Sequence, residues 1–113
     1  MIIITKPYKT KQKYMIQKLN KTNFNETINS TEPVLVKFSS NWCGPCKVVG
    51  KTLEEIQSTL PCKVYEVDVD ENMELCDEYN ITNIPVIMLF KSSEMLKKHV
   101  GLISKEEIEQ FVK

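Results

Sequence analysis

Short runs of hydrophobic residues, separated by polar stretches, predict five strands along this chain. The clearest run is Val34-Leu35-Val36-Lys37-Phe38, which is rich in β-branched and aromatic residues. The predicted strands span residues 16–20, 34–39, 63–69, 86–91 and 95–100. The last two are close enough in sequence to pair as an antiparallel hairpin.

A different spacing indicates helices between these strands. After Lys47, hydrophobic residues recur at helical intervals and predict a helix over residues 43–60. Shorter helices are predicted at residues 23–29, 73–79 and 105–112. Helices that join parallel strands, followed by a terminal hairpin, predict an α/β fold in which a mixed central β-sheet carries helices on both faces.

Length and composition narrow the class of protein. A chain of 113 residues, with 42% hydrophobic and 27% charged residues, is a single globular domain that needs no disulfide to fold. The formal net charge of zero gives no reason to expect a nucleic-acid or membrane partner. No stretch is long and apolar enough to span a membrane, and residues 1–4 are too short for a signal-peptide core. We therefore expect a cytoplasmic protein.

Two cysteines carry the candidate chemistry. Cys43 and Cys46 stand three residues apart, directly after a predicted strand and at the start of the predicted helix. The free N–H groups and the positive dipole end of a helix N-terminus favour a thiolate over a thiol. Cys43 is therefore predicted to be the attacking sulfur. Cys46 lies one turn further along and can resolve a mixed disulfide formed on Cys43.

A metal site or a structural disulfide fits this cysteine pair less well. Half a zinc site would need a second pair of ligands, but Cys62, Cys76 and His99 stand apart from one another. A structural disulfide across such a short loop gains little chain entropy. We expect no metal, and we expect Cys76 to be buried, while Cys62 could be exposed.

The hexapeptide Trp42-Cys43-Gly44-Pro45-Cys46-Lys47 matches the active-site signature of the thioredoxin family. The segments 64–70, 79–85 and 90–111 resemble the third central strand of that family, the loop before its cis-proline, and its final hairpin and helix. The resemblance covers about residues 16–113, and we place the domain at 15–113. Residues 1–14 would be an N-terminal extension: a disordered tail, an additional edge strand, or sequence upstream of a start at Met15.

The resemblance implies further site residues. Gly44 and Pro45 between the thiols are typical of reducing members of the family. Oxidases and isomerases of the family, by contrast, typically have a histidine before the second cysteine. Pro85 corresponds to the cis-proline that stacks beside the thiols, and the exposed peptide group of Ile84 would pair with an extended substrate. Gly101 would leave room for the partner chain.

Trp42 has two possible roles. The resemblance implies that it covers the edge of the disulfide and contributes to substrate docking. A tryptophan can equally serve as simple core filler.

Lys37 departs from the family pattern. It stands where relatives usually have a buried aspartate, and Glu66 stands where they often have a lysine. The two could form the same partly buried ion pair with its charges exchanged, or one or both could reach solvent. If the pair exists, Glu66 could accept the proton of Cys46. Gly50 replaces a helix-kinking proline of many relatives.

The sequence thus predicts a protein-disulfide reductase that acts through a reversible Cys43–Cys46 dithiol/disulfide. Its implied partners are disulfide-containing proteins and an NADPH- and flavin-dependent thioredoxin reductase. We expect a monomer with no cofactor of its own. The alternatives are a disulfide isomerase or oxidase, and a binding subunit in which the thiols are incidental.

Overall fold

The computed structural model describes residues 16–113, so the expectations for residues 1–14 lie outside it. In chain order the elements are β1 (Gln17–Leu19), α2 (Phe24–Ile28), β2 (Val34–Ser39), α3 (Gly44–Ile56), a 3₁₀ turn η2 (Gln57–Thr59), β3 (Lys63–Asp68), α4 (Met73–Glu78), β4 (Val86–Lys91), β5 (Glu94–Val100) and α5 (Lys105–Phe111). Each predicted strand and helix is present, with ends that differ by a few residues.

The strands of the described part form one mixed sheet in the order β1-β3-β2-β4-β5. β1 and β2 both run parallel to the central strand β3. β4 runs antiparallel to β2 and to β5, with which it forms the terminal hairpin. The predicted α/β class with a mixed sheet is confirmed.

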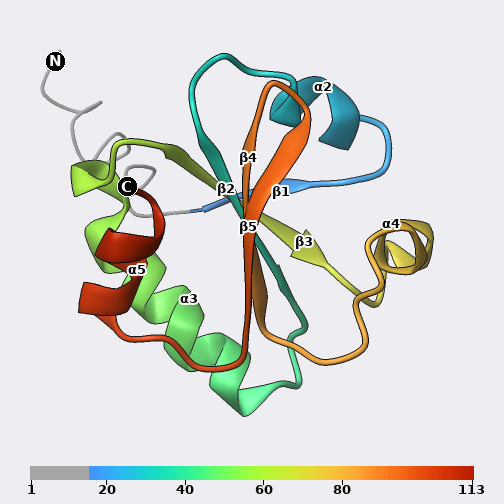
Figure 1. The fold of residues 1–113 in the computed structure, drawn as a ribbon. Coiled ribbons are helices and arrows are strands. Elements are labelled where there is room, and N and C mark those ends of the chain that lie inside the picture. Colours follow the sequence, from blue (N-terminus) through green and yellow to red (C-terminus); the bar gives the residue numbers. More distant parts are fainter. Residues whose placement is uncertain (1–15) are drawn as a thin grey trace, which may run out of the picture.

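Helices cover both faces of this sheet, as Figure 1 shows: α3 and α5 lie on one side, and α2 and α4 on the other. The alternation of side chains along β2 explains the division, because successive residues of a strand point to opposite faces. Val34, Val36 and Phe38 enter the core beneath α2 and α4. Leu35 enters the core beneath α3 and α5, and Lys37 therefore points to the α3 face.

The helix α3, which contains Cys46, is shorter than predicted. It ends at Ile56, and the chain tightens into the 3₁₀ turn η2 rather than continuing to Leu60. There Thr59 Oγ1 donates a hydrogen bond to the carbonyl of Ile56, and the Leu60 N–H donates to Gln57. Such tightening is common at helix ends, where the last carbonyls lack helical partners.

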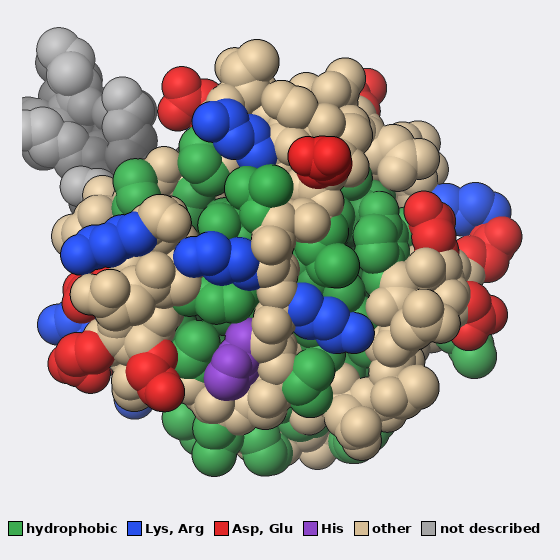
Figure 2. Space-filling view, in the orientation of Figure 1, with side chains coloured by type: hydrophobic (Ala, Val, Ile, Leu, Met, Phe, Trp, Pro, Cys, Tyr) green, Lys and Arg blue, Asp and Glu red, His purple; other side chains and the backbone are tan. Residues whose placement is uncertain are grey.

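β5 is the outer strand next to β4. Most of its side chains are exposed, and they include Glu94, Lys97 and Lys98. In the view of Figure 2, which has the orientation of Figure 1, charged side chains and patches of hydrophobic ones alternate across this face. Charges along an edge strand discourage pairing with a foreign strand. None of the helices described is of the length and apolarity that a membrane crossing requires.

Candidate active site

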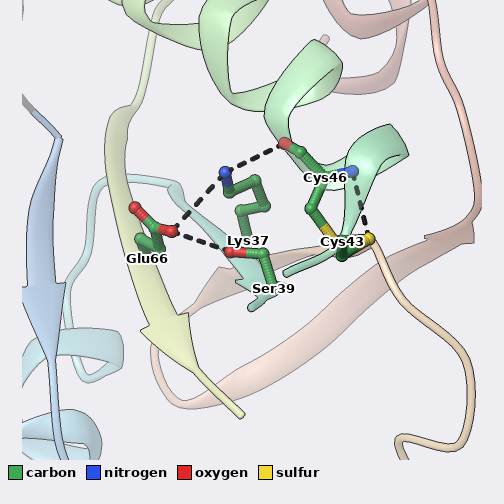
Figure 3. Close-up of polar contacts among 5 residues, drawn as sticks. All are labelled: Lys37, Ser39, Cys43, Cys46 and Glu66. Carbon is green, nitrogen blue, oxygen red and sulfur yellow. Dashed lines mark hydrogen bonds and ion pairs between the residues drawn. A yellow bond between two sulfur atoms is a disulfide. The ribbon is translucent and has the colours of Figure 1, made fainter. Parts of the chain in front are cut away.

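The cysteine pair lies where β2 passes into α3. Cys43 is the N-cap of this helix and is joined to Cys46 by a disulfide. The Cys46 N–H donates a hydrogen bond to Cys43 Sγ over 3.2 Å, as Figure 3 shows. Pro45 falls in the first turn, where the missing N–H of proline costs nothing. The predicted position of Cys43 at a helix N-terminus is therefore confirmed.

The two sulfur-bearing residues are not equally accessible. In the disulfide form Cys43 is 6% exposed and Cys46 is 1% exposed. Both residues are thus buried in this form, and Cys43 is the slightly more accessible of the two. The order in which the two thiols attack and resolve stays a prediction.

Trp42 lies on the surface beside the disulfide. Its side chain is 72% exposed, so it does not fill the core. The indole Nε1–H donates a hydrogen bond to Asp70 Oδ2 over 2.9 Å. Asp70 was not predicted as a site residue, because it lies 28 residues further along the chain, just after β3. Only the parallel pairing of β2 and β3 brings the two together.

The loop before β4 meets the end of β5. The Ile84–Pro85 peptide bond is cis, Pro85 is buried and Ile84 is half-buried. The N–H of Gly101 donates a hydrogen bond to the carbonyl of Pro85 over 2.8 Å. The peptide groups of Ile84 form no hydrogen bond with another described residue. This hydrogen bond thus joins the loop before β4 to the residue after β5, although the two lie far apart in the sequence.

The backbone conformation at position 101 favours glycine over other residues. Its φ of +99° lies in a region that favours glycine. A Cβ added at this position would have no atom of the described protein within 4 Å. The glycine therefore faces open space.

Lys37 and Glu66 face each other across β2 and β3. The two residues are paired in register, and their side chains lie on the α3 face of the sheet. Lys37 Nζ lies 3.6 Å from Glu66 Oε2, with side-chain exposures of 6% and 22%. The exchanged ion pair is thus present, and neither side chain is free in solvent. Both groups give up hydration, which their attraction offsets only in part.

Ser39 is a site residue that the sequence did not reveal. Its buried hydroxyl donates a hydrogen bond to Glu66 Oε2 over 2.7 Å, so the carboxylate is held by both Ser39 and Lys37 (Figure 3). The period-two pattern of a strand places residues 37 and 39 on one face. That pattern could have indicated Ser39, had the ion pair been known.

A cleft of about 410 Å³ opens beside this pair and reaches Cys46. Its lining includes Lys37, Ser39, Ser40, Gly50 and Glu66. The buried hydroxyl of Ser40 has no hydrogen-bond partner among the described residues. A polar space of this size can admit water, so Cys46 and the ion pair share a route to solvent.

The remaining cysteines lie away from the disulfide. Cys62 and Cys76 are free thiols and both are half-buried, so the expectation that Cys76 is fully buried is wrong. α4 buries only Leu75, because this short helix presents one narrow side to the core. Burial raises the pKa of Cys62 to about 11. Within residues 16–113, no group of three or more His, Cys, Asp or Glu residues is arranged to hold a metal ion.

Comparisons with known proteins agree with this geometry. The family model described as Thioredoxin matches residues 15–113. A thioredoxin of Mycoplasmoides gallisepticum is 36% identical over 95 residues, which cover 83% of this chain and 95% of that protein. The mitochondrial thioredoxin of Bos taurus is 35% identical over 88 residues, or 76% of this chain and 53% of that protein. The chain thus spans about half the length of this mitochondrial relative.

A solved structure supports the same assignment. The thioredoxin of Plasmodium falciparum superimposes with a TM-score of 0.79 at 28% identity, covering 86% of this chain and 96% of that one. The sheet order, the disulfide at the start of α3 and the family match are consistent with one another. The chain therefore belongs to the thioredoxin family, and it is a thiol–disulfide oxidoreductase of the protein-disulfide reductase type, with Cys43 and Cys46 as its redox pair.

Proposed function

We propose that Cys43 begins each reductive cycle by attacking a disulfide in a partner protein. Its thiolate forms a bond to one target sulfur, the target S–S bond breaks, and the other target sulfur leaves as a thiolate. Cys46 then attacks Cys43 Sγ and releases the second target thiolate. Two electrons pass to the target, whose sulfurs take up two protons, and the Cys43–Cys46 disulfide is left.

One contact carries the assignment of Cys43 as nucleophile. The Cys46 N–H points at Cys43 Sγ from the first turn of α3. In the reduced protein this donor and the helix dipole would stabilise a thiolate on Cys43. The slightly greater exposure of Cys43 supports the same order of events.

We propose a docking surface for extended substrates that consists of Trp42, Ile84, Pro85 and Gly101. The exposed indole supplies apolar contact area, and its hydrogen bond to Asp70 fixes its orientation. The unpaired peptide groups of Ile84 can bond to the backbone of a target strand. Gly101 presents no side chain to that strand.

We further propose that Glu66 accepts the proton that Cys46 loses on resolution. The supporting observation is the cleft that contains both residues, together with the Ser39 hydroxyl that is bonded to Glu66. A base that reaches the thiol through water in this cleft would speed this step. The test is Glu66→Gln, with the rate of mixed-disulfide resolution followed between pH 6 and 8. An unchanged profile would remove Glu66 from the mechanism.

The partner that regenerates the dithiol is proposed to be an NADPH- and flavin-dependent thioredoxin reductase. The cell compartment is proposed to be the cytoplasm, and the oligomeric state a monomer. The match to the thioredoxin family model supports the first of these. Size-exclusion chromatography of the full chain tests the last.

The deciding experiment is insulin reduction with NADPH and a thioredoxin reductase, using the wild type, Cys43→Ser and Cys46→Ser. The wild type should turn over, and neither variant should. Cys46→Ser should accumulate a mixed disulfide with the target, because the resolving thiol is missing. Cys43→Ser should accumulate none. If only Cys43→Ser trapped the target, the two roles would be reversed. If a variant with both cysteines replaced by serine still fulfilled the cellular role of the protein, a binding subunit would be favoured.

A further inference from the structure

The ion pair of Lys37 and Glu66 is oriented with one of its two charged groups toward the redox site. Lys37 Nζ lies 3.4 Å from the carbonyl oxygen of Cys46 and 3.6 Å from Glu66 Oε2. Figure 3 shows the ammonium between the carboxylate and Cys46. The positive end of the pair therefore faces the backbone carbonyl of Cys46, while the carboxylate lies beyond it. Both distances are long for hydrogen bonds, so the ammonium acts mainly through its charge.

The surroundings hold this direction in place. Ser39 fixes the carboxylate through its 2.7 Å hydrogen bond to Oε2, the same oxygen that faces Lys37. Gly50 leaves the space that the ammonium fills, because a Cβ there would lie 2.5 Å from Lys37 Nζ. The lysine side chain is 6% exposed, whereas that of Glu66 is 22% exposed. Water therefore screens the carboxylate more than it screens the ammonium.

We infer that Lys37 presents the positive end of this pair to the resolving cysteine and stabilises the Cys46 thiolate in the reduced protein. A cation held at the carbonyl of a residue favours a negative charge on the side chain of that same residue. Two consequences follow. Cys46 attacks the mixed disulfide as a thiolate in a larger fraction of molecules, and the reduced dithiol is stabilised relative to the disulfide. Lys37 is thus a positioning residue that sets both the resolution step and the potential of the couple.

Removing Lys37 alone would not test this inference, because the unpaired Glu66 carboxylate would itself disfavour a nearby thiolate. The informative variant removes both charges at once, Lys37→Met with Glu66→Gln. If the ammonium dominates at Cys46, loss of the pair disfavours the thiolate. If the carboxylate dominates, loss of the pair favours it.

The matched control is Lys51→Met with Glu54→Gln. These two residues line the same cleft, but both are exposed, and α3 carries them away from Cys46. The chemical change is identical in the two double variants. Replacement of a buried ion pair by neutral residues is usually tolerated. If the test variant nevertheless fails to fold, Lys37→Met with Glu66→Met removes the same charges with apolar groups.

The first measurement is the equilibrium of the oxidised protein with two glutathione thiols, which gives the protein dithiol and glutathione disulfide. We expect removal of the Lys37–Glu66 pair to make the dithiol about tenfold more reducing, which corresponds to about 30 mV. The control should match the wild type. An unchanged or more oxidising couple in the test variant would overturn the inference.

The second measurement isolates Cys46. In a Cys43→Ser background, the pH dependence of Cys46 alkylation is followed on its own peptide by mass spectrometry, which separates it from Cys62 and Cys76. Removal of the Lys37–Glu66 pair should move the midpoint to higher pH, and a midpoint that stays or falls would contradict the inference.

The inference rests on the proposed role of Cys46 but not on Glu66 as a base. Insulin turnover by the wild type is tested separately, so failure of the proposed cycle is distinguishable.

Discussion

The ammonium of Lys37 occupies the space that a side chain on Gly50 would need. Residue 50 is buried on α3, one turn after Cys46, and it faces β2 at the point where Lys37 rises from the sheet. A Cβ at position 50 would lie 2.5 Å from Lys37 Nζ but 3.9 Å from Lys37 Cε. The conflict is therefore with the terminal nitrogen alone. The Lys37 side chain and the missing side chain of Gly50 are therefore complementary in packing.

Gly50→Ala should consequently destabilise the wild type by about 1 kcal/mol, the low end of the usual range for overpacking a core, because the atom to be displaced is the end of a flexible side chain. In a Lys37→Met background the terminal nitrogen is absent, and the nearest remaining atom is at ordinary contact distance. There the same substitution should stabilise by up to about 1 kcal/mol, because alanine is the better helix former. Urea unfolding of the four proteins measures the coupling. An equal cost in both backgrounds would show that Lys37 does not set the requirement for glycine.

Gly101→Ala should lower the free energy of unfolding by about 1–2 kcal/mol, since alanine is strained at positive φ. The strained segment donates the hydrogen bond to Pro85, so binding of target peptides should weaken as well. Urea unfolding and peptide titration give the two values. Gly44→Ala is the control for stability, because Gly44 has no positive φ and no atom within 4 Å of an added Cβ. Equal effects of the two substitutions would show that backbone strain at Gly101 is not the cause.

The start of α5 should contribute to stability in a pH-dependent way. The Ser104 N–H donates to Glu107 Oε1 and the Glu107 N–H donates to Ser104 Oγ, which forms a capping box. The backbone hydrogen bond from Ser104 holds the pKa of the Glu107 carboxyl below its ordinary value of 4.5. A lowered pKa in the folded state means stabilisation that is present above 4.5 and lost as the pH falls through the folded-state value.

Glu107→Gln retains the cap but removes its charge. The variant should therefore be less stable than the wild type at pH 7, and the difference should disappear on acidification below the folded-state pKa of Glu107. Thermal unfolding across this pH range is the measurement. Glu106→Gln removes a carboxylate from the same turn without touching the capping box. A pH-independent difference for Glu107→Gln would contradict a role for its charge.

The free thiols should react in a fixed order. After reduction at pH 7.5, iodoacetamide should modify Cys43 first and Cys62 last. The helix N-terminus favours the Cys43 thiolate, whereas burial raises the pKa of Cys62 to about 11. The pKa of Cys76 is also raised, by burial and then by the carboxylates of Asp77, Asp70 and Asp68. Peptide mass spectrometry resolves the four sites. Early modification of Cys62 would show that its burial is not maintained in solution.

The strands, the helices and the redox pair could be predicted from the sequence because each has a local cause. Short hydrophobic runs and helical spacing located each strand and α-helix, though not the 3₁₀ turn η2, and the separation of Cys43 from Cys46 indicated thiol exchange. The end of α3 was predicted too late, because the tightening after Ile56 depends on hydrogen bonds made by Gln57 and Thr59 rather than on periodicity. Local patterns fix what a segment becomes, but they leave its end to the competition among nearby hydrogen bonds.

The tertiary structure alone decided which distant residues share the site. The sequence suggested an exchange of charges between Lys37 and Glu66, but only the register of β2 on β3 places them side by side. The same pairing brings Asp70 to Trp42, and the packing of α3 on the sheet turns the ammonium toward the carbonyl of Cys46 and places it against Gly50. These contacts depend on strand order and helix placement, which are set by burial of the whole core. The sequence by itself determined the chemistry of the two thiols. The packed fold decided that the charged group nearest to Cys46 in this ion pair is the Lys37 ammonium rather than the Glu66 carboxylate.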